Sequence, residues 1–162
     1  MTIRKASAAD AAAAWEIRNA AILAECKGHY PPELLAIWTN GAITEEFIQF
    51  IVEQFYVAIV DGAVVGTGMI DRNTGRLDAI MVRPDKMRQG IGKQMVSFLE
   101  DLGRAAGLTK LTLDATLNAA PFYRRCGFVG EAKGTYQSPR GIVLDCIPMT
   151  KVLSVDSPRP PT

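Results

Sequence analysis

The hydrophobic positions of this chain follow two periods, and the longer one predicts its helices. Over residues 90–106 the apolar side chains recur three or four positions apart, at Ile91, Met95, Phe98, Leu99 and Leu102. This spacing places them on one face of an α-helix. Further helices are expected at about 10–24, 33–38, 45–54 and 119–126. The first of these is broken at Gly28-His29-Tyr30-Pro31-Pro32, because proline cannot continue a helix.

The shorter period, together with turn signals, predicts the strands. Tyr56–Val60 and Val64–Asp71 flank Asp61-Gly62, which suits a tight hairpin because glycine accepts the positive φ that such turns need. The other strands are expected at Thr2–Ala6, Arg76–Val82, Lys110–Ala115, Phe128–Thr135 and Ile142–Thr150. The predicted fold is one mixed α/β (α+β) domain over residues 2–153, a central mixed sheet flanked by helices in the order β-α-α-β-β-β-α-β-α-β-β. Residues 154–162 contain three prolines and are expected to form a disordered tail.

Composition narrows the class of protein. With 162 residues, a formal charge of +1 and 22% charged residues, the chain forms one domain and has no large basic field for nucleic acid. No stretch reads as a signal peptide or a membrane span, so we expect a cytoplasmic protein with no nucleic-acid or membrane partner. Its 3 cysteines are far apart and its single histidine cannot complete a zinc set, so no metal is expected.

The loop before the helix at 90–106 predicts a ligand that carries phosphate. Gly90-Ile91-Gly92 follows a strand and Pro84, and a glycine loop that opens a helix presents unpaired N–H groups at the positive end of the helix dipole. A P-loop is excluded because Gln94 follows Lys93, where that motif needs Ser or Thr. A dinucleotide fold is excluded because position 95 is Met, where its third glycine belongs.

Two motifs resemble those of the GNAT superfamily of acetyl-CoA-dependent N-acetyltransferases. Residues 77–93, with a strand, Pro84 and Gly90-Ile91-Gly92, are similar to the family's central motif, roughly V-x-P…[QR]-x-x-G-x-[GA]. Residues 118–128, Asn-Ala-Ala-Pro-Phe-Tyr-Arg-Arg-Cys-Gly-Phe, are similar to its later motif. They lie in the family's order, and the resemblance covers roughly residues 2–153. One departure is Met87, where the family usually has Gln or Arg.

The resemblance implies acetyl-CoA as acetyl donor. Its pantetheine arm would lie along Ile80, Met81 and Val82, and its pyrophosphate would bind the backbone of the loop. The cofactor-binding residues that the resemblance implies are Ile80, Met81, Val82, Met87, Arg88, Gln89, Gly90, Ile91, Gly92, Lys93, Asn118 and Phe122. A β-carbon at Gly90 or Gly92 would obstruct the approach of the phosphates. Asn118 would contact the pantetheine or cap its helix.

The resemblance also assigns catalytic roles. Tyr123 stands where the family's acid protonates the departing thiolate, and backbone N–H groups at the distorted end of Ile80–Val82 would polarise the thioester carbonyl. Asp78 is our candidate for the base, with Asp114 or a water chain as the alternative, because the sequence does not say which carboxylate faces the cleft. His29 and Tyr30 are the candidate acceptor-binding residues.

The predicted function is direct transfer of an acetyl group from acetyl-CoA to a primary amine in a ternary complex. The acceptor is a small metabolite, an amino acid, an antibiotic or a protein N-terminus. Two alternatives stay open: a catalytically idle acyl-CoA-binding regulatory module, and a generic phosphate-binding domain that binds ATP and CoA equally. An exposed Trp38 or Phe50 would indicate a homodimer.

Overall fold

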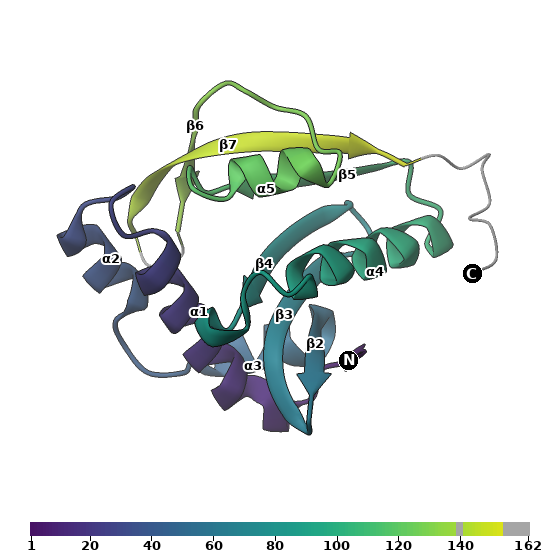
Figure 1. Cartoon of the computed structure of the whole chain (residues 1–162), viewed down its shortest axis with the longest axis horizontal. Helices are drawn as coiled ribbons and strands as arrows, with labels where there is room; N and C mark the ends of the chain where they lie inside the picture. Colours follow the sequence, from purple (N-terminus) through teal and green to yellow (C-terminus); the bar gives the residue numbers. More distant parts are fainter. Residues whose placement is uncertain (139–140, 154–162) are drawn as a thin grey trace.

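Seven strands form one sheet in the order β1-β2-β3-β4-β5-β7-β6 (Figure 1). The computed structural model describes residues 1–138 and 141–153. The strands are β1 (Thr2–Lys5), β2 (Phe55–Val60), β3 (Ala63–Asp71), β4 (Arg76–Val82), β5 (Lys110–Ala115), β6 (Gly134–Gln137) and β7 (Val143–Val152). Neighbouring strands are antiparallel except β4 and β5, which are parallel. This confirms the mixed α/β fold class.

The helices cover both faces of the sheet. They are α1 (Ala11–Glu25), α2 (Pro32–Thr39), α3 (Glu45–Gln54), α4 (Ile91–Ala105) and α5 (Ala120–Arg125). Buried side chains of α4, such as Met95 and Leu99, and Tyr123 of α5 join Leu77 and Leu113 in one core cluster. Two smaller clusters place α1 with α2 and with α3 against the other face. Three helices therefore lie between β1 and β2, one for each expected segment, where the predicted order has two.

The hairpin between β2 and β3 forms at Asp61-Gly62, as the sequence predicts. Asp61 and Gly62 have φ of 51° and 78°, the pair of left-handed residues that a tight two-residue turn requires. The expected strand Phe128–Thr135 was wrong in its bounds, because β6 begins only at Gly134. Val129 keeps a single bridge to Thr150, and the chain leaves the ladder before it pairs again with the first half of β7.

β4 and β5 separate after one paired position, and this divergence creates the opening in the centre of the molecule. Their only registered pair is Arg76 with Thr112. Gly75, with φ of 82°, brings the β3–β4 turn against β5, and a β-carbon there would lie 2.4 Å from the Lys110 carbonyl oxygen. Beyond this point α5 lies between β5 and α4 (Figure 1).

The strand β4 also carries a bulge. Its register with β3 shifts between Thr67 and Met69, and Ala79 takes a left-handed φ of 50°. The Thr67 hydroxyl donates a 2.7 Å hydrogen bond to the Ala79 carbonyl oxygen, which holds the distortion in place. A bulge re-aims the side chains at and after it, so the alternation breaks at Ala79, whereas Asp78 still alternates with the buried Leu77.

Several expectations concern surfaces. The predicted tail, residues 154–162, lies outside the described residues. Trp38 is buried, whereas Phe50 is half exposed, so a homodimer stays a prediction that would use Phe50 alone. None of the helices in residues 1–138 and 141–153 has both the length and the apolar character needed to cross a membrane. In the same ranges no three His, Cys, Asp or Glu side chains lie together as a metal site would require.

Candidate active site

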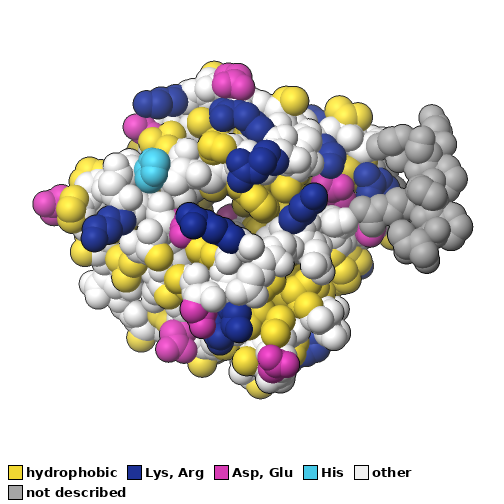
Figure 2. Space-filling view, viewed as in Figure 1, with side chains coloured by type: hydrophobic (Ala, Val, Ile, Leu, Met, Phe, Trp, Pro, Cys, Tyr) yellow, Lys and Arg dark blue, Asp and Glu magenta, His cyan; other side chains and the backbone are white. Residues whose placement is uncertain are grey.

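A cavity of about 1700 Å³ occupies the space between β4, β5, α1 and the starts of α4 and α5. Figure 2 shows its hollow near the centre of one face, with Lys and Arg side chains at the rim. Most of the residues expected to bind the donor line it. These are Ile80, Met81, Val82, Met87, Arg88, Gly90, Ile91, Gly92, Lys93, Asn118 and Phe122, together with both residues expected to be catalytic, Tyr123 and Asp78. Gln89 is not among the lining residues.

The start of α4 offers unpaired backbone donors to the cavity. The first helical hydrogen bond runs from the Gln94 N–H to the Gly90 carbonyl, so the three N–H groups of residues 91–93 have no partner within the helix. Arg88 and Gly90 have φ of 64° and 83°, and successive left-handed turns of this kind gather N–H groups into an anion-binding concavity. Asp and Glu are absent from the first turn.

Glycine is favoured at the two positions of this turn, 90 and 92, for different structural reasons. At Gly90 a β-carbon would meet nothing closer than 3.9 Å, so glycine is favoured there by its positive φ. At Gly92 a β-carbon would lie 3.3 Å from the Phe122 ring and 3.6 Å from Val82, so glycine lets α4 approach α5 and β4 closely. The predicted obstruction of phosphates stays a prediction for both positions.

One edge of β4 faces the opening with unpaired backbone groups. The Arg83 N–H bonds to the Val65 carbonyl, and Met81 pairs with Thr67. Because N–H groups alternate along a strand, those of Ile80 and Val82 point away from β3, toward the space that β5 leaves. An extended ligand can add to such an edge as another strand.

Asn118 carries a buried oxygen without a partner. Among the described residues its Oδ1 accepts no hydrogen bond, although it is shielded from solvent and the residue lines the cavity. The prediction that Asn118 caps the helix was wrong, because the N-cap of α5 is Ala119 and no side chain caps it. A buried acceptor left unsatisfied costs about 1–3 kcal/mol, so this oxygen favours a ligand that donates to it.

Tyr123 is buried, and its ring is held on two sides. Its centroid lies 5.1 Å from that of Phe122 and 5.9 Å from that of Phe128, both in edge-to-face contact. No hydrogen bond to its hydroxyl occurs within residues 1–138 and 141–153. Burial, and next the charges of Asp78 and Cys126, raise the pKa of its phenol far above the usual value, so the phenol keeps its proton.

Asp78 is exposed on the wall of the cavity, so water reaches its carboxylate, although the surrounding protein still desolvates that group in part. Burial raises the pKa of Asp78, opposed by a 2.8 Å hydrogen bond from the Ala79 N–H and by the charge of Arg76. Asp114 differs, because it accepts a 2.9 Å hydrogen bond from Arg76 in an ion pair. A carboxylate with a raised pKa suits a base better than one held by a guanidinium.

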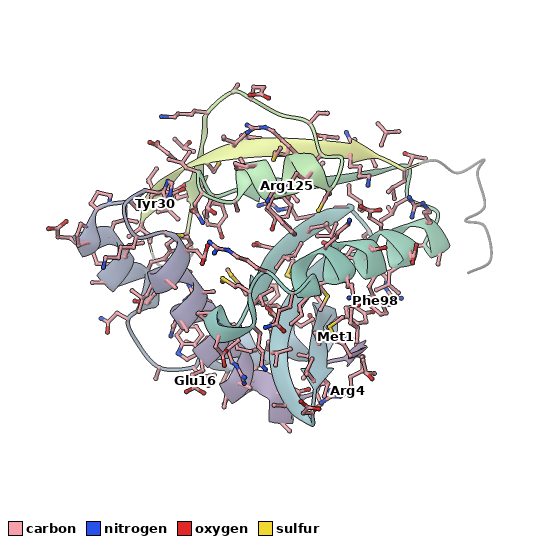
Figure 3. The ribbon with its side chains drawn as sticks, in the orientation of Figure 1. Met1, Arg4, Glu16, Tyr30, Phe98 and Arg125 are labelled. Atoms are coloured by element: carbon pink, nitrogen blue, oxygen red, sulfur yellow. The ribbon has the colours of Figure 1, made fainter. Side chains whose placement is uncertain are left out.

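His29 and Tyr30 do not line the cavity. His29 is exposed, and the Tyr30 hydroxyl donates 2.6 Å to the Asp145 carbonyl and accepts 3.1 Å from the Leu117 N–H. Figure 3 shows Tyr30 beside the N-terminal end of β7, well away from Arg125. Tyr30 therefore ties three segments together, and an acceptor contact for either residue stays a prediction without support from this geometry.

Several lining residues escaped sequence reasoning. Arg125 and Lys86 join Arg88 and Lys93 as cations on the cavity wall (Figure 3 labels Arg125 on α5). The three-residue spacing from Phe122 to Arg125 on a helix was the signal that could have found Arg125. On the far side Arg18 and Tyr136 also line the cavity. No local pattern marks these two, because only the tertiary structure brings them to Asp78.

Comparison with known proteins agrees with this geometry. The family model described as acetyltransferase (GNAT) domain matches residues 26–153. The chain therefore belongs to the GNAT family of acetyltransferases, and the resemblance found in the sequence is confirmed.

Individual relatives are more distant. An uncharacterized N-acetyltransferase of Escherichia coli K12, YafP, is 28% identical over 100 residues, 62% of each chain. The IAA acetyltransferase of Azospirillum brasilense is 35% identical over 82 residues, 46% of this chain and 54% of that one. The chain thus spans less than two thirds of the length of either relative.

Solved structures match over more of the chain. The GCN5-related N-acetyltransferase of Rhodopseudomonas palustris superposes with a TM-score of 0.85 at 28% identity, covering 94% of this chain and 95% of that one. The PaiA N-acetyltransferase of Thermoplasma acidophilum, solved with coenzyme A, gives 0.69 at 19% identity, covering 93% and 98%. The second likeness shows the fold alone.

Proposed function

We propose that residues 2–153 form an N-acetyltransferase that moves an acetyl group from acetyl-CoA to a primary amine while both substrates are bound. The observation that carries the proposal is the opening between β4 and β5. It is bordered by the unpaired start of α4 and has Tyr123 and Asp78 on its wall. This combination provides a place for an extended donor, a place for its phosphates, and a proton donor and acceptor beside them.

The donor would be held mainly by backbone. The free edge of β4 at Ile80 and Val82 fits the amides of a pantetheine arm, and the orphaned Asn118 Oδ1 would accept from one of them. The N–H groups of residues 91–93 fit the pyrophosphate. Cations on the cavity wall add attraction for the phosphates, at Lys86, Arg88, Lys93 and Arg125. Met87 also lines the cavity, but its side chain offers no hydrogen-bond donor and its backbone N–H donates to the Pro84 carbonyl, so the side chain of Arg88 would replace the contact of the family's Gln or Arg.

The transfer would use three groups of this chain. Asp78 takes the proton of the attacking amine, directly or through water, as the new carbon–nitrogen bond forms. The N–H groups at the end of β4 stabilise the negative charge that develops on the carbonyl oxygen. Tyr123 gives its proton to the sulfur as the carbon–sulfur bond breaks. The raised pKa of Tyr123 ensures that this proton is present. Asp78 then releases the amine's proton to solvent, and the Tyr123 phenolate takes a proton back from solvent, which restores both groups.

A second candidate is an idle acyl-CoA-binding module, which Met87 favours because it removes a side-chain contact to the donor. Two measurements separate the readings. Calorimetric titration should show CoA binding at least about tenfold tighter than ATP, because ATP has no group for the β4 edge. Acetyl-CoA with a panel of amines should then release free thiol. CoA binding without any release would support the idle module, and equal binding of ATP and CoA would overturn both in favour of a generic phosphate site.

A further inference from the structure

Arg18 of α1 lies on the cavity wall and takes no part in the steps above. Its Nη1 donates to the Trp38 carbonyl oxygen at 3.1 Å and to Asn19 Oδ1 at 2.7 Å. The guanidinium also lies 4.9 Å from the centre of the Trp15 ring. Both N–H groups of Nη1 serve these two hydrogen bonds, so a ligand would approach the Nε and Nη2 side of the guanidinium. These contacts hold the guanidinium of Arg18 in a fixed position on the cavity wall.

Arg18 stands on the same side of the sheet as Asp78. Leu77 and Leu113 point into the core cluster with α4, so the residues beside them on the strands, Arg76 and Asp114, project from the opposite face. This is the face against which α1 packs, and Arg76 and Asp114 form an ion pair there. The charge of Arg18 acts on both Asp78 and Tyr136, where it opposes the larger effect of burial on each pKa. An acceptor whose amine reaches Asp78 therefore passes beside Arg18.

The other charged side chains beside α1 determine how an acceptor is oriented between Asp78 and Arg18. Arg76 is held by Asp114 at 2.9 Å. In the half of the cavity beside α1, Lys86 is a further cation, because residues 84–86 contact α1. The other charged side chains there are carboxylates, at Glu25, Glu46, Asp71 and Asp145. They repel an anion and attract an ammonium, so the field favours the amine at Asp78 and an anionic group at Arg18.

We propose that Arg18 binds a carboxylate of the acceptor, so that the amine acetylated by this protein is one that carries a carboxylate, such as a free amino acid. The planar fork of a guanidinium matches a carboxylate with two parallel hydrogen bonds. This inference rests on the proposed function, since it uses Asp78 as the place of the reacting amine. It goes further by naming the chemical class of the acceptor.

The test compares acids with their uncharged partners. The 20 standard amino acids and the ω-amino acids from β-alanine to 6-aminohexanoate are each assayed beside the matching carboxamide, with acetyl-CoA and thiol release as the readout. A charged hydrogen-bonded contact is worth about 1.5–3 kcal/mol, so the best acid should exceed its amide roughly 10- to 100-fold in kcat/KM. An amide that equals or exceeds its acid throughout the panel overturns the inference.

Variants assign the effect to Arg18. R18Q should lose that 10- to 100-fold for the acid and leave the amide within about twofold, which abolishes the preference. The control is K27Q, which removes an exposed cation from the segment after the same helix without touching the cavity, and it should keep the preference. Should R18Q fail to fold, R18K retains the charge but not the fork, and the acid alone should fall several-fold. A full preference for the acid in R18Q, or in R18K where R18Q does not fold, overturns the inference.

The same panel separates this inference from the proposed function. Acetylation of amides or simple amines without preference for acids leaves the function standing and removes the role of Arg18. An absence of thiol release with every amine, in protein that binds acetyl-CoA, overturns both.

Discussion

Tyr123 combines a phenol that keeps its proton with a ring packed between Phe122 and Phe128. Y123F keeps the packing and removes only the hydroxyl. If the phenol protonates the departing thiolate, turnover should fall about 10²- to 10⁴-fold while the KM for acetyl-CoA stays within a few-fold. Steady-state kinetics with any competent acceptor measures this.

The control for Y123F is the same change at a remote tyrosine. Tyr56 is buried, its hydroxyl accepts a hydrogen bond from Arg72, and neither residue lines the cavity. Y56F should cost about 1 kcal/mol of stability for the lost hydrogen bond and leave turnover unchanged. Normal turnover in Y123F would instead leave water as the proton source.

Asp78 makes a prediction about stability as well as rate. Its pKa is raised in the folded protein, so the folded state holds this proton more tightly than the unfolded state. Ionisation of Asp78 therefore costs stability, in full above the raised pKa and not at all below the ordinary value of 3.8. D78N should melt at a higher temperature than the wild type at neutral pH, and the difference should vanish near pH 3.

The same variant should lose activity. Replacing the base should lower kcat/KM about 10²- to 10⁴-fold and remove the rise of rate with pH that follows ionisation of Asp78. Five charged or titratable groups interact with this carboxyl: Arg76, Asp114, Arg18, Tyr123 and Tyr136. D114N is the informative partner, because a larger loss there would transfer the role of base to Asp114.

At the scale of elements, the two ends of α4 provide a matched pair of glycines. Gly90 and Gly107 have φ of 83° and 81°, and a β-carbon at either has open space around it, with nothing within 3.9 Å. Alanine in this conformation costs about 1–2 kcal/mol, so G90A and G107A should lose similar stability. Only G90A disturbs the N–H groups at the start of the helix, so only G90A should weaken CoA binding, by roughly tenfold or more. Equal CoA affinity in the two variants by calorimetric titration would remove the phosphates from this turn.

The same scale shows how the elements of the site are fixed to one another. The Lys151 ammonium, on β7, bonds Glu100 of α4 at 2.8 Å and the carbonyl of Cys126, at the end of α5, at 2.7 Å. Glu100 is almost fully buried. This contact joins α4, which begins at the turn Gly90-Ile91-Gly92, to the helix that carries Tyr123.

For the whole molecule, the sheet consists of two parts joined at one registered pair between β4 and β5. A donor that adds to β4 would bridge them. Hydrogen exchange at saturating CoA should slow at Ile80 and Val82, whose N–H groups face the opening, and at residues 91–93. Binding at 100 times Kd should also stabilise the fold by about 2.7 kcal/mol.

The control ligand is adenosine 3′,5′-bisphosphate, which has phosphates but no pantetheine. It should slow exchange at residues 91–93 only. Protection of Ile80 and Val82 by this ligand, or none by CoA, would contradict the bridging of the two parts of the sheet.

Local signals in the sequence were sufficient for most elements and for the turn at which we propose that the donor binds. The three- and four-residue spacing in 90–106 and the Asp61-Gly62 turn act within a few residues, so they determine helix and hairpin before any tertiary contact forms. The motif at Gly90-Ile91-Gly92 likewise needs only a strand, a loop and a helix in succession. Short-range steric and hydrogen-bonding preferences decide these features, and the sequence carries them directly.

The tertiary structure alone decided how side chains meet across the cavity. Asp78 borders the opening because β4 separates from β5 after Arg76, and the register of β4 depends on β3. The Tyr30 hydroxyl lies outside the cavity because it forms hydrogen bonds with the backbone of Asp145 and Leu117, more than 80 residues later in the chain. Arg18 lies near Asp78 only because α1 packs against the sheet. Such contacts join residues far apart in sequence, where spacing carries no information on direction, so packing and strand register determine them.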